Sequence, residues 1–192
     1  MRNTTALLLA AGGGRRLGNR PKALLPFRGR PLVEHAVSVL RAGGCARVLV
    51  VLGAAAQEVL ARADLTGCEV VLNEDWETGM GSSCGPVSPR CRRSRTRRWS
   101  PRGHTGVTPE AVRRVLAQEA ELAAAAYAGE RGHPVLIARR HWPEAAAGAQ
   151  GDAGARALLR AHADELRLVE VGDVAENADI DTEADWRALQ GR

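Results

Sequence analysis

Short apolar runs alternate along the chain with segments in which apolar residues recur at helical spacing. The run Ala6 to Ala10 ends in a glycine cluster, which predicts a buried strand that leads into a loop. The segment Leu32 to Leu40 has helical spacing and predicts a helix that Gly43 and Gly44 end. The other elements predicted in this half are strands at 46–53 and 68–73 and a helix at 55–63.

The second half of the chain continues this alternation. Thr108 can cap a helix in which Pro109 takes the first position, and apolar spacing extends that predicted helix through Leu122. A last helix is predicted near the C-terminus, with Thr182 as its cap. The remaining predicted elements are strands at 133–138 and 166–171 and a helix at 152–163.

The order of these elements predicts one α/β domain over residues 1–192, a three-layer α/β/α arrangement with a mainly parallel sheet. Right-handed crossovers place the loops that follow the strands at one edge of such a sheet, where open α/β sheets bind ligands. The glycine-rich loop after the first strand is therefore expected to be a binding site.

The composition is that of a globular protein, with 45% hydrophobic but only 3% aromatic residues, so the core must be mainly aliphatic. No apolar run is long enough for a transmembrane helix, and the N-terminus lacks a signal-peptide layout. We expect a cytoplasmic protein with no membrane partner. The four cysteines show no CxxC pair and no zinc-like spacing with the histidines, which favours reduced thiols.

The net charge of +5 comes from a single segment. Cys84 to Gly106, "CGPVSPRCRRSRTRRWSPRGHTG", holds seven arginines and no acidic residue, and the rest of the chain has 20 basic and 22 acidic residues. An arginine-rich nucleic-acid-binding segment, with Trp99 stacking on a base, is the lesser interpretation, because nothing else in the chain supports it.

The stretch "LLLAAGGGRRLGNRPKALLPF" carries the strongest functional signal. Gly12, Gly13 and Gly14 follow the first strand and offer backbone N–H groups that can wrap a phosphate. Arg16 and Lys22 add positive charge suited to a triphosphate. The pattern predicts a nucleotide site.

Two common types of glycine loop fit this sequence less well. A P-loop needs GxxxxGK[ST], but Gly18 is followed by Asn19. A Rossmann dinucleotide loop needs an acidic residue at the end of the second strand, whereas Glu34 falls inside the first predicted helix. A glycine-rich turn with solvated arginines remains a simpler alternative.

The stretch "LAAGGGRRLGNRPKALLPFRGRPLVEHAV" resembles the MobA-like NTP transferase family, whose first loop reads L-A-[AG]-G-x-[GS]-x-R-[LM]-G and is followed by P-K-x-L. Five further blocks match, in order, the branch that includes molybdenum cofactor cytidylyltransferase: "VVLGAAAQEV", "VVLNEDWETGMGSS", "GHPVLIARRHW", "GDAGARALLRAH" and "DIDTEAD". The resemblance implies a Rossmann-like fold of the nucleotide-diphospho-sugar transferase type.

The resemblance also implies an activity. Such enzymes transfer a nucleoside monophosphate from an NTP to an acceptor phosphate and release pyrophosphate. In this family the loop form L-A-A-G is associated with CTP, and Leu9 to Gly12 has that form. We therefore expect CMP transfer from CTP to the molybdopterin cofactor, with a molybdoenzyme or its chaperone as a protein partner.

The resemblance assigns nucleotide-binding and catalytic roles to particular residues. Arg16 and Lys22 would neutralise the triphosphate and the leaving pyrophosphate. The nucleotide-binding residues it implies are Ala11, Gly12, Gly13 and Gly14, through main-chain groups, and Ser82 and Ser83 of "GMGSS". The alternative for Gly79 to Ser83 is a helix cap.

The remaining implied residues serve the acceptor and the metal. His133, Asp152 and Arg156 would shape the acceptor side, although a structural role explains His133 equally well. Asp181, with Asp179 beside it, matches the D-x-D-T loop that supplies a Mg²⁺ ligand in the family. Helix capping is the alternative role of these two aspartates.

Residues 84–106 interrupt the family pattern, which has a helix, an apolar strand and a metal-binding D-x-P loop there. The chain reads "SPRGHTGVTP" where the aspartate is expected. A slip of the reading frame would explain both the composition and the missing elements, and a disordered insert is the alternative. A catalytically impaired nucleotide-binding remnant is therefore the second functional interpretation.

Overall fold

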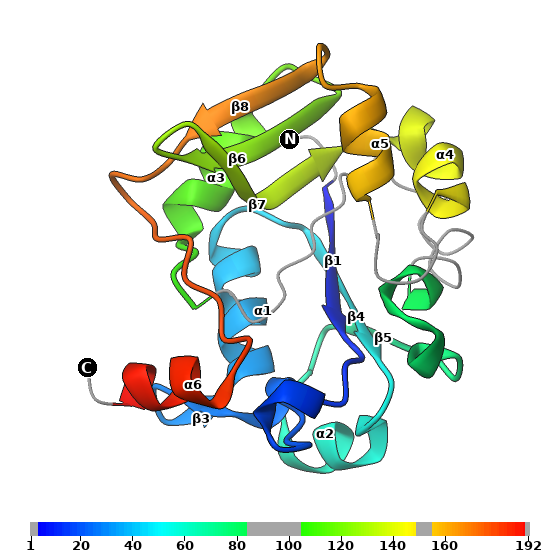
Figure 1. The fold of residues 1–192 in the computed structure, drawn as a ribbon, viewed down its shortest axis with the longest axis vertical. Helices are drawn as coiled ribbons and strands as arrows, with labels where there is room; N and C mark the ends of the chain where they lie inside the picture. Colours follow the sequence, from blue (N-terminus) through cyan, green and yellow to red (C-terminus); the bar gives the residue numbers. More distant parts are fainter. Residues whose placement is uncertain (1–3, 84–104, 149–154, 191–192) are drawn as a thin grey trace.

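The computed structural model describes residues 4–83, 105–148 and 155–190 (Figure 1). Most of the arginine-rich segment and its predicted irregularity therefore lie outside the described residues, as does Asp152. Its last two residues, Thr105 and Gly106, are described, and the carbonyl of Gly106 accepts a hydrogen bond from the N–H of Glu176 at 3.1 Å.

The N-terminal half forms a parallel three-stranded sheet in the order β1-β4-β5. Leu49 and Val51 of β4 face one side of it, while Val48 and Val50 face the other, and all four are buried. Burial on both faces is typical of parallel sheets covered by helices, as the sequence predicted. The elements are β1 (Thr5–Ala10), α1 (Leu32–Ala42), β4 (Arg47–Leu52), α2 (Ala56–Arg62) and β5 (Glu69–Leu72).

Short elements surround the carboxyl ends of these strands. They arise where glycine and proline interrupt the apolar pattern, because neither residue favours a long helix. The short elements are η1 (Arg15–Leu17), η2 (Lys22–Leu24), β2 (Pro26–Phe27), β3 (Arg30–Pro31), η3 (Trp76–Thr78) and η4 (Met80–Ser83).

The second half builds another three-stranded sheet, in the order β7-β6-β8. Strand β6 is parallel to β8 and antiparallel to β7, so the described sheets are parallel except for one edge strand and the short β2–β3 pair. The elements are α3 (Pro109–Ala117), β6 (Leu122–Tyr127), β7 (Glu130–Ile137), η6 (Arg139–His141), α4 (Trp142–Ala147), α5 (Arg156–Ala161), β8 (Leu166–Glu170) and α6 (Glu183–Gln190).

The predicted helix from Thr108 through Leu122 is wrong in its second part. Helix α3 ends at Ala117, and Leu122 begins strand β6. The alanines of β6 favour a helix locally, but pairing with β7 on one side and β8 on the other holds them in a strand, where they are buried. The predicted capping by Thr108 is confirmed, because its hydroxyl accepts a hydrogen bond from the N–H of Ala111.

A shared core joins the two sheets. Leu7 and Leu49 of the first sheet lie in the same buried cluster as Leu122 and Ile137 of the second, together with Trp142 of α4. The expected α/β fold with helices on a mainly parallel sheet is thereby confirmed. No helix among the described residues is long and apolar enough to cross a bilayer.

The chain after β8 runs down one side of the molecule to α6, which lies against the N-terminal loops (Figure 1). Ile180 and Trp186 from this region share a buried cluster with Leu17, Leu25 and Phe27. Residues from the two ends of the sequence are therefore held together by an apolar contact.

Candidate functional site

The glycine loop after β1 has a fixed shape. The carbonyl of Gly14 accepts hydrogen bonds from the N–H groups of Leu17 and Asn19 at 2.8 and 3.1 Å. Gly14 has a φ of +67°, and a Cβ placed on it would lie 1.8 Å from the carbonyl oxygen of Arg20. Only glycine fits this position, because both the backbone angle and the close contact exclude a side chain.

Trp76, which follows β5, packs against this loop. A Cβ placed on Gly13 would lie 3.3 Å from the ring of Trp76. A Cβ placed on Gly53 would lie 2.6 Å from the Cβ of Trp76. The N–H of Ala54 donates to the carbonyl of Ala11 at 3.1 Å. The loops after β1, β4 and β5 therefore meet at one edge of the sheet, as predicted for the binding edge.

Lys22 lies between the two aspartates that were expected to bind metal. Its Nζ is 2.6 Å from Oδ1 of Asp179 and 3.4 Å from Oδ1 of Asp181. The side chains of Lys22 and Asp179 are largely buried, whereas Asp181 is exposed. Burial raises the pKa of Asp179, and the hydrogen bond from Lys22 opposes that rise. The structure thus brings one predicted catalytic residue onto both predicted metal ligands.

The loop that carries these aspartates is held by its neighbours. Ile180, 2% exposed, anchors it in the apolar cluster beneath the N-terminal loops. Thr182 caps α6, because its hydroxyl accepts from the N–H of Asp185 at 3.2 Å, which confirms the predicted cap. The Asp185 carboxylate in return accepts from the N–H groups of Asp181 and Thr182.

The two serines of "GMGSS" are held by a buried asparagine. Nδ2 of Asn73, at the carboxyl end of β5, donates to the hydroxyl oxygens of Ser82 and Ser83 at 2.8 and 2.9 Å. The hydroxyl of Ser82 also donates to the carbonyl of Gly79 at 2.7 Å. The serines thus have a structural role in fixing η4. Their expected contact with the nucleotide stays a prediction.

The other predicted residues lie on different elements. Arg16 is exposed on η1, and Arg156 is exposed at the start of α5. His133 lies on β7, and its carbonyl accepts a hydrogen bond from the hydroxyl of Tyr127 at 2.7 Å. Their assigned roles toward phosphates and acceptor also stay predictions.

Sequence reasoning missed Asn73, Trp76 and Asp185. The first two lie within the matched block "VVLNEDWETGMGSS", so their position in that block was a usable signal. For Asp185 the signal was the spacing T-x-x-D in "TEAD", which is typical of a reciprocal helix cap.

Residues 6–166 match the model of the MobA-like NTP transferase domain. The chain belongs to the MobA-like NTP transferase family. This membership confirms the coarse assignment, an enzyme of a nucleotidyltransferase family.

One curated protein and several solved structures are similar to this chain over nearly its whole length. Nicotine blue oxidoreductase from Paenarthrobacter nicotinovorans is 40% identical over 187 residues, which cover 93% of this chain and 92% of that protein. The crystal structure of a homologue of Mycobacterium tuberculosis rv0371c from Mycobacterium sp. strain JC1 has 31% identity and a TM-score of 0.85, covering 100% of this chain and 98% of that one.

A third similar structure is that of Rv0371C from Mycobacterium tuberculosis H37Rv in complex with manganese. It has 29% identity and a TM-score of 0.80, and the match covers 100% of this chain and 99% of that one. These similarities confirm the Rossmann-like α/β fold.

Proposed function

We propose that this chain transfers CMP from CTP to the molybdopterin cofactor and releases pyrophosphate, with a divalent metal ion. The observation that carries the proposal is the placement of Lys22 between Asp179 and Asp181, in the segment that follows the glycine loop. Family membership supports nucleotidyl transfer, and the loop form Leu9 to Gly12 favours CTP.

In the proposed reaction an oxygen of the acceptor phosphate attacks the α-phosphorus of CTP, and the bond to the β-phosphate oxygen breaks. Main-chain N–H groups from Ala11 to Gly14 would hold the nucleotide, because the loop is already fixed in shape. Lys22 and Arg16 would stabilise the negative charge that accumulates on the leaving pyrophosphate.

Asp179 and Asp181 fit a divalent metal. They offer hard carboxylate oxygens, which Mg²⁺ prefers, and they already hold a cation in the form of the Lys22 ammonium. The metal would supply charge neutralisation at the triphosphate. Lys22 would then be available to donate to a phosphate oxygen. The manganese bound to Rv0371C supports a divalent ion of this kind.

A pyrophosphate-release assay with each NTP, with and without molybdopterin, tests the proposal. Release with CTP that depends on both molybdopterin and Mg²⁺ or Mn²⁺ is expected. Turnover with another NTP or only with another acceptor would contradict the stated substrates. CTP binding without turnover under all conditions would instead support the impaired nucleotide-binding remnant.

The similarity to nicotine blue oxidoreductase favours one second candidate, reduction of nicotine blue or a related dye. In that case the glycine loop would hold the nucleotide part of an electron donor such as NADH or NADPH. Bleaching of the dye with stoichiometric oxidation of the donor would establish this activity. Absence of bleaching, together with CTP-dependent pyrophosphate release, would eliminate it.

A further inference from the structure

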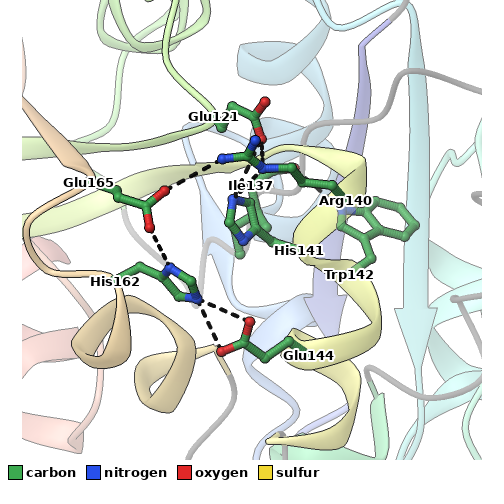
Figure 2. Close-up of polar contacts among 8 residues, drawn as sticks. All are labelled: Glu121, Ile137, Arg140, His141, Trp142, Glu144, His162 and Glu165. Carbon is green, nitrogen blue, oxygen red and sulfur yellow. Dashed lines mark hydrogen bonds and ion pairs between the residues drawn. The ribbon is translucent and has the colours of Figure 1, made fainter.

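A compact polar cluster lies around α4 and α5, on the opposite side of the molecule from α6 (Figure 1). Figure 2 shows its members turned toward one another from three segments. His141 ends η6, Glu144 lies in the first turn of α4, and His162 follows α5. The cluster is thus separate from the Lys22–aspartate site.

Three side chains in this cluster offer metal ligands to a common point. One ligand atom each of His141, Glu144 and His162 lies within 4.8 Å of the others. In a tetrahedral zinc site with bonds of about 2.0–2.1 Å the ligand atoms are about 3.4 Å apart, so modest side-chain rotations complete the site. His141 and Glu144 are three residues apart, which brings their side chains to neighbouring positions.

A carboxylate contacts each imidazole ring from the side. The Nδ1 of His162 is 2.9 Å from Oε1 of Glu165, while its Nε2 is 3.0 Å from Oε2 of Glu144. The Nε2 of His141 is 3.5 Å from Oε2 of Glu121. Glu165 and Glu121 are not among the three candidate ligands, and carboxylates placed in this way fix the ring orientation of ligating histidines and increase their basicity.

The charges of the cluster leave room for a divalent cation. Two carboxylates, from Glu121 and Glu165, pair with the guanidinium of Arg140, and a third, from Glu144, contacts His162 (Figure 2). The Nε of Arg140 donates to Nε2 of His141 at 3.2 Å, and its side chain is 61% exposed, so it can move aside. With neutral imidazoles the net charge is negative, and a divalent ion would neutralise it.

We propose that His141, Glu144 and His162 form a binding site for a transition-metal ion, with Zn²⁺ as the preferred occupant. Two imidazole nitrogens and one carboxylate form a donor set common for zinc, whereas Mg²⁺ prefers oxygen ligands only. Bound metal would link α4 to the end of α5. The three protein ligands leave the remaining positions to water.

The test is a Zn²⁺ titration of the full chain, freed of metal by a chelator, against a chromophoric zinc indicator. We expect binding of about one equivalent, with affinity reduced about 10–100-fold or more in both His162→Gln and Glu144→Gln. Co²⁺ used as a spectroscopic probe should give the visible bands of a nitrogen- and oxygen-ligated ion, and both variants should lose them. Circular dichroism establishes that each variant is folded, and Glu144 is exposed enough to be changed without disturbing the core.

Two control variants make the result specific. His35→Gln removes a histidine from α1, outside the cluster, and Asp179→Asn changes the proposed catalytic site, so both should retain the Zn²⁺ affinity. Failure of the unaltered chain to bind Zn²⁺ would overturn the proposal and leave a purely structural network of ion pairs. Binding that survives both His162→Gln and Glu144→Gln, or that Asp179→Asn abolishes, would also overturn it.

Discussion

At the scale of single residues, the central feature is a lysine that shares two aspartates. Lys22 and Asp179 are partly desolvated together, and a charge in such a position needs its partner. The pair therefore compensates both charges in the structure, and in the proposed reaction the same groups would serve the phosphates and the metal.

Lys22→Ala should lower kcat for nucleotidyl transfer about 100- to 1000-fold, because it removes a preorganised positive charge at the phosphates. The rate of pyrophosphate release at saturating CTP measures this loss of kcat. The matched control is Arg20→Ala, two residues away, which removes an exposed cation that lies 3.7 Å from Glu183. Equal losses in the two variants would show that only the general positive charge of this loop matters.

Substitutions at two glycines of the first loop can distinguish the cost of backbone strain from the cost of steric overlap. Gly14 and Gly18 both have positive φ, but a Cβ on Gly18 meets nothing within 4 Å, whereas one on Gly14 overlaps the carbonyl of Arg20. Gly18→Ala should cost about 1 kcal/mol of unfolding free energy, and Gly14→Ala clearly more, with loss of CTP binding. Urea unfolding and CTP titration measure both quantities, and equal effects would contradict the described loop geometry.

At the scale of elements, the close approach of two helices depends on a glycine. Helix α3 lies against the C-terminal end of α1, where a Cβ on Gly43 would lie 2.5 Å from Cβ of Val112. Gly43 has ordinary helical angles, so its absence of a side chain serves this contact and not the backbone. Gly43, one of the glycines that end α1, therefore also permits α3 to pack closely against α1.

Gly43→Ala should therefore destabilise the protein by about 1–3 kcal/mol through overlap with Val112. Gly148→Ala is the matched control, because Gly148 also ends a helix with ordinary angles and would gain only normal contacts. Thermal unfolding compares the two. Gly43→Ala combined with Val112→Ala should recover part of the loss, and no recovery would place the cause elsewhere.

The end of β8 stabilises the β6–β7 turn through one carboxylate. The N–H groups of Gly129, Gly172 and Ala128 donate to Glu170 and lower its pKa below the ordinary 4.5. Since the folded-state pKa is the lower one, this stabilisation is present above about pH 4.5 and is lost as the pH falls through the folded value.

Glu170→Gln should accordingly lower the urea midpoint at pH 7, and the difference from the unaltered chain should shrink below about pH 4.5. Urea unfolding curves recorded between about pH 3.5 and 7 measure this difference in midpoint. Glu130→Gln, on the neighbouring β7, is the control and should shift the midpoint less at every pH. A difference that stays constant with pH would show that the charge of Glu170 is not the cause.

At the scale of the whole molecule, segments near the two ends of the chain pack against each other. Trp186 of α6 is 5% exposed and packs with Leu17 and Phe27 near the glycine loop. This contact holds the loop of Asp179 and Asp181 against Lys22, more than 150 residues away in sequence.

Trp186→Ala should cost about 3–5 kcal/mol of unfolding free energy and raise the metal concentration needed for half-maximal activity. Thermal unfolding and a Mg²⁺ titration of pyrophosphate release measure the two effects. Arg187→Ala removes an exposed ion pair from the same helix and should change neither appreciably. Loss of stability with unchanged metal dependence would separate α6 docking from metal binding.

Much of the local structure was predictable because it depends on near neighbours in sequence. The strands β1, β4 and β5, the helix α1 and the caps at Thr108 and Thr182 follow from short-range patterns of apolar, glycine and capping residues. The glycine loop followed from one contiguous motif, and the family followed from that motif together with five further blocks that match in order. The phosphate binding proposed for this loop would need only consecutive backbone groups.

The remaining features depend on groups that are distant in sequence. The alanines of β6 favour a helix locally and become a strand because β7 and β8 enclose them on both sides. Lys22 meets Asp179 because an apolar cluster docks α6 on the N-terminal loops, and His141 meets His162 because α4 packs on α5. The sequence by itself determined the fold class, the family and the glycine loop, whereas only tertiary packing decided which charged side chains face one another.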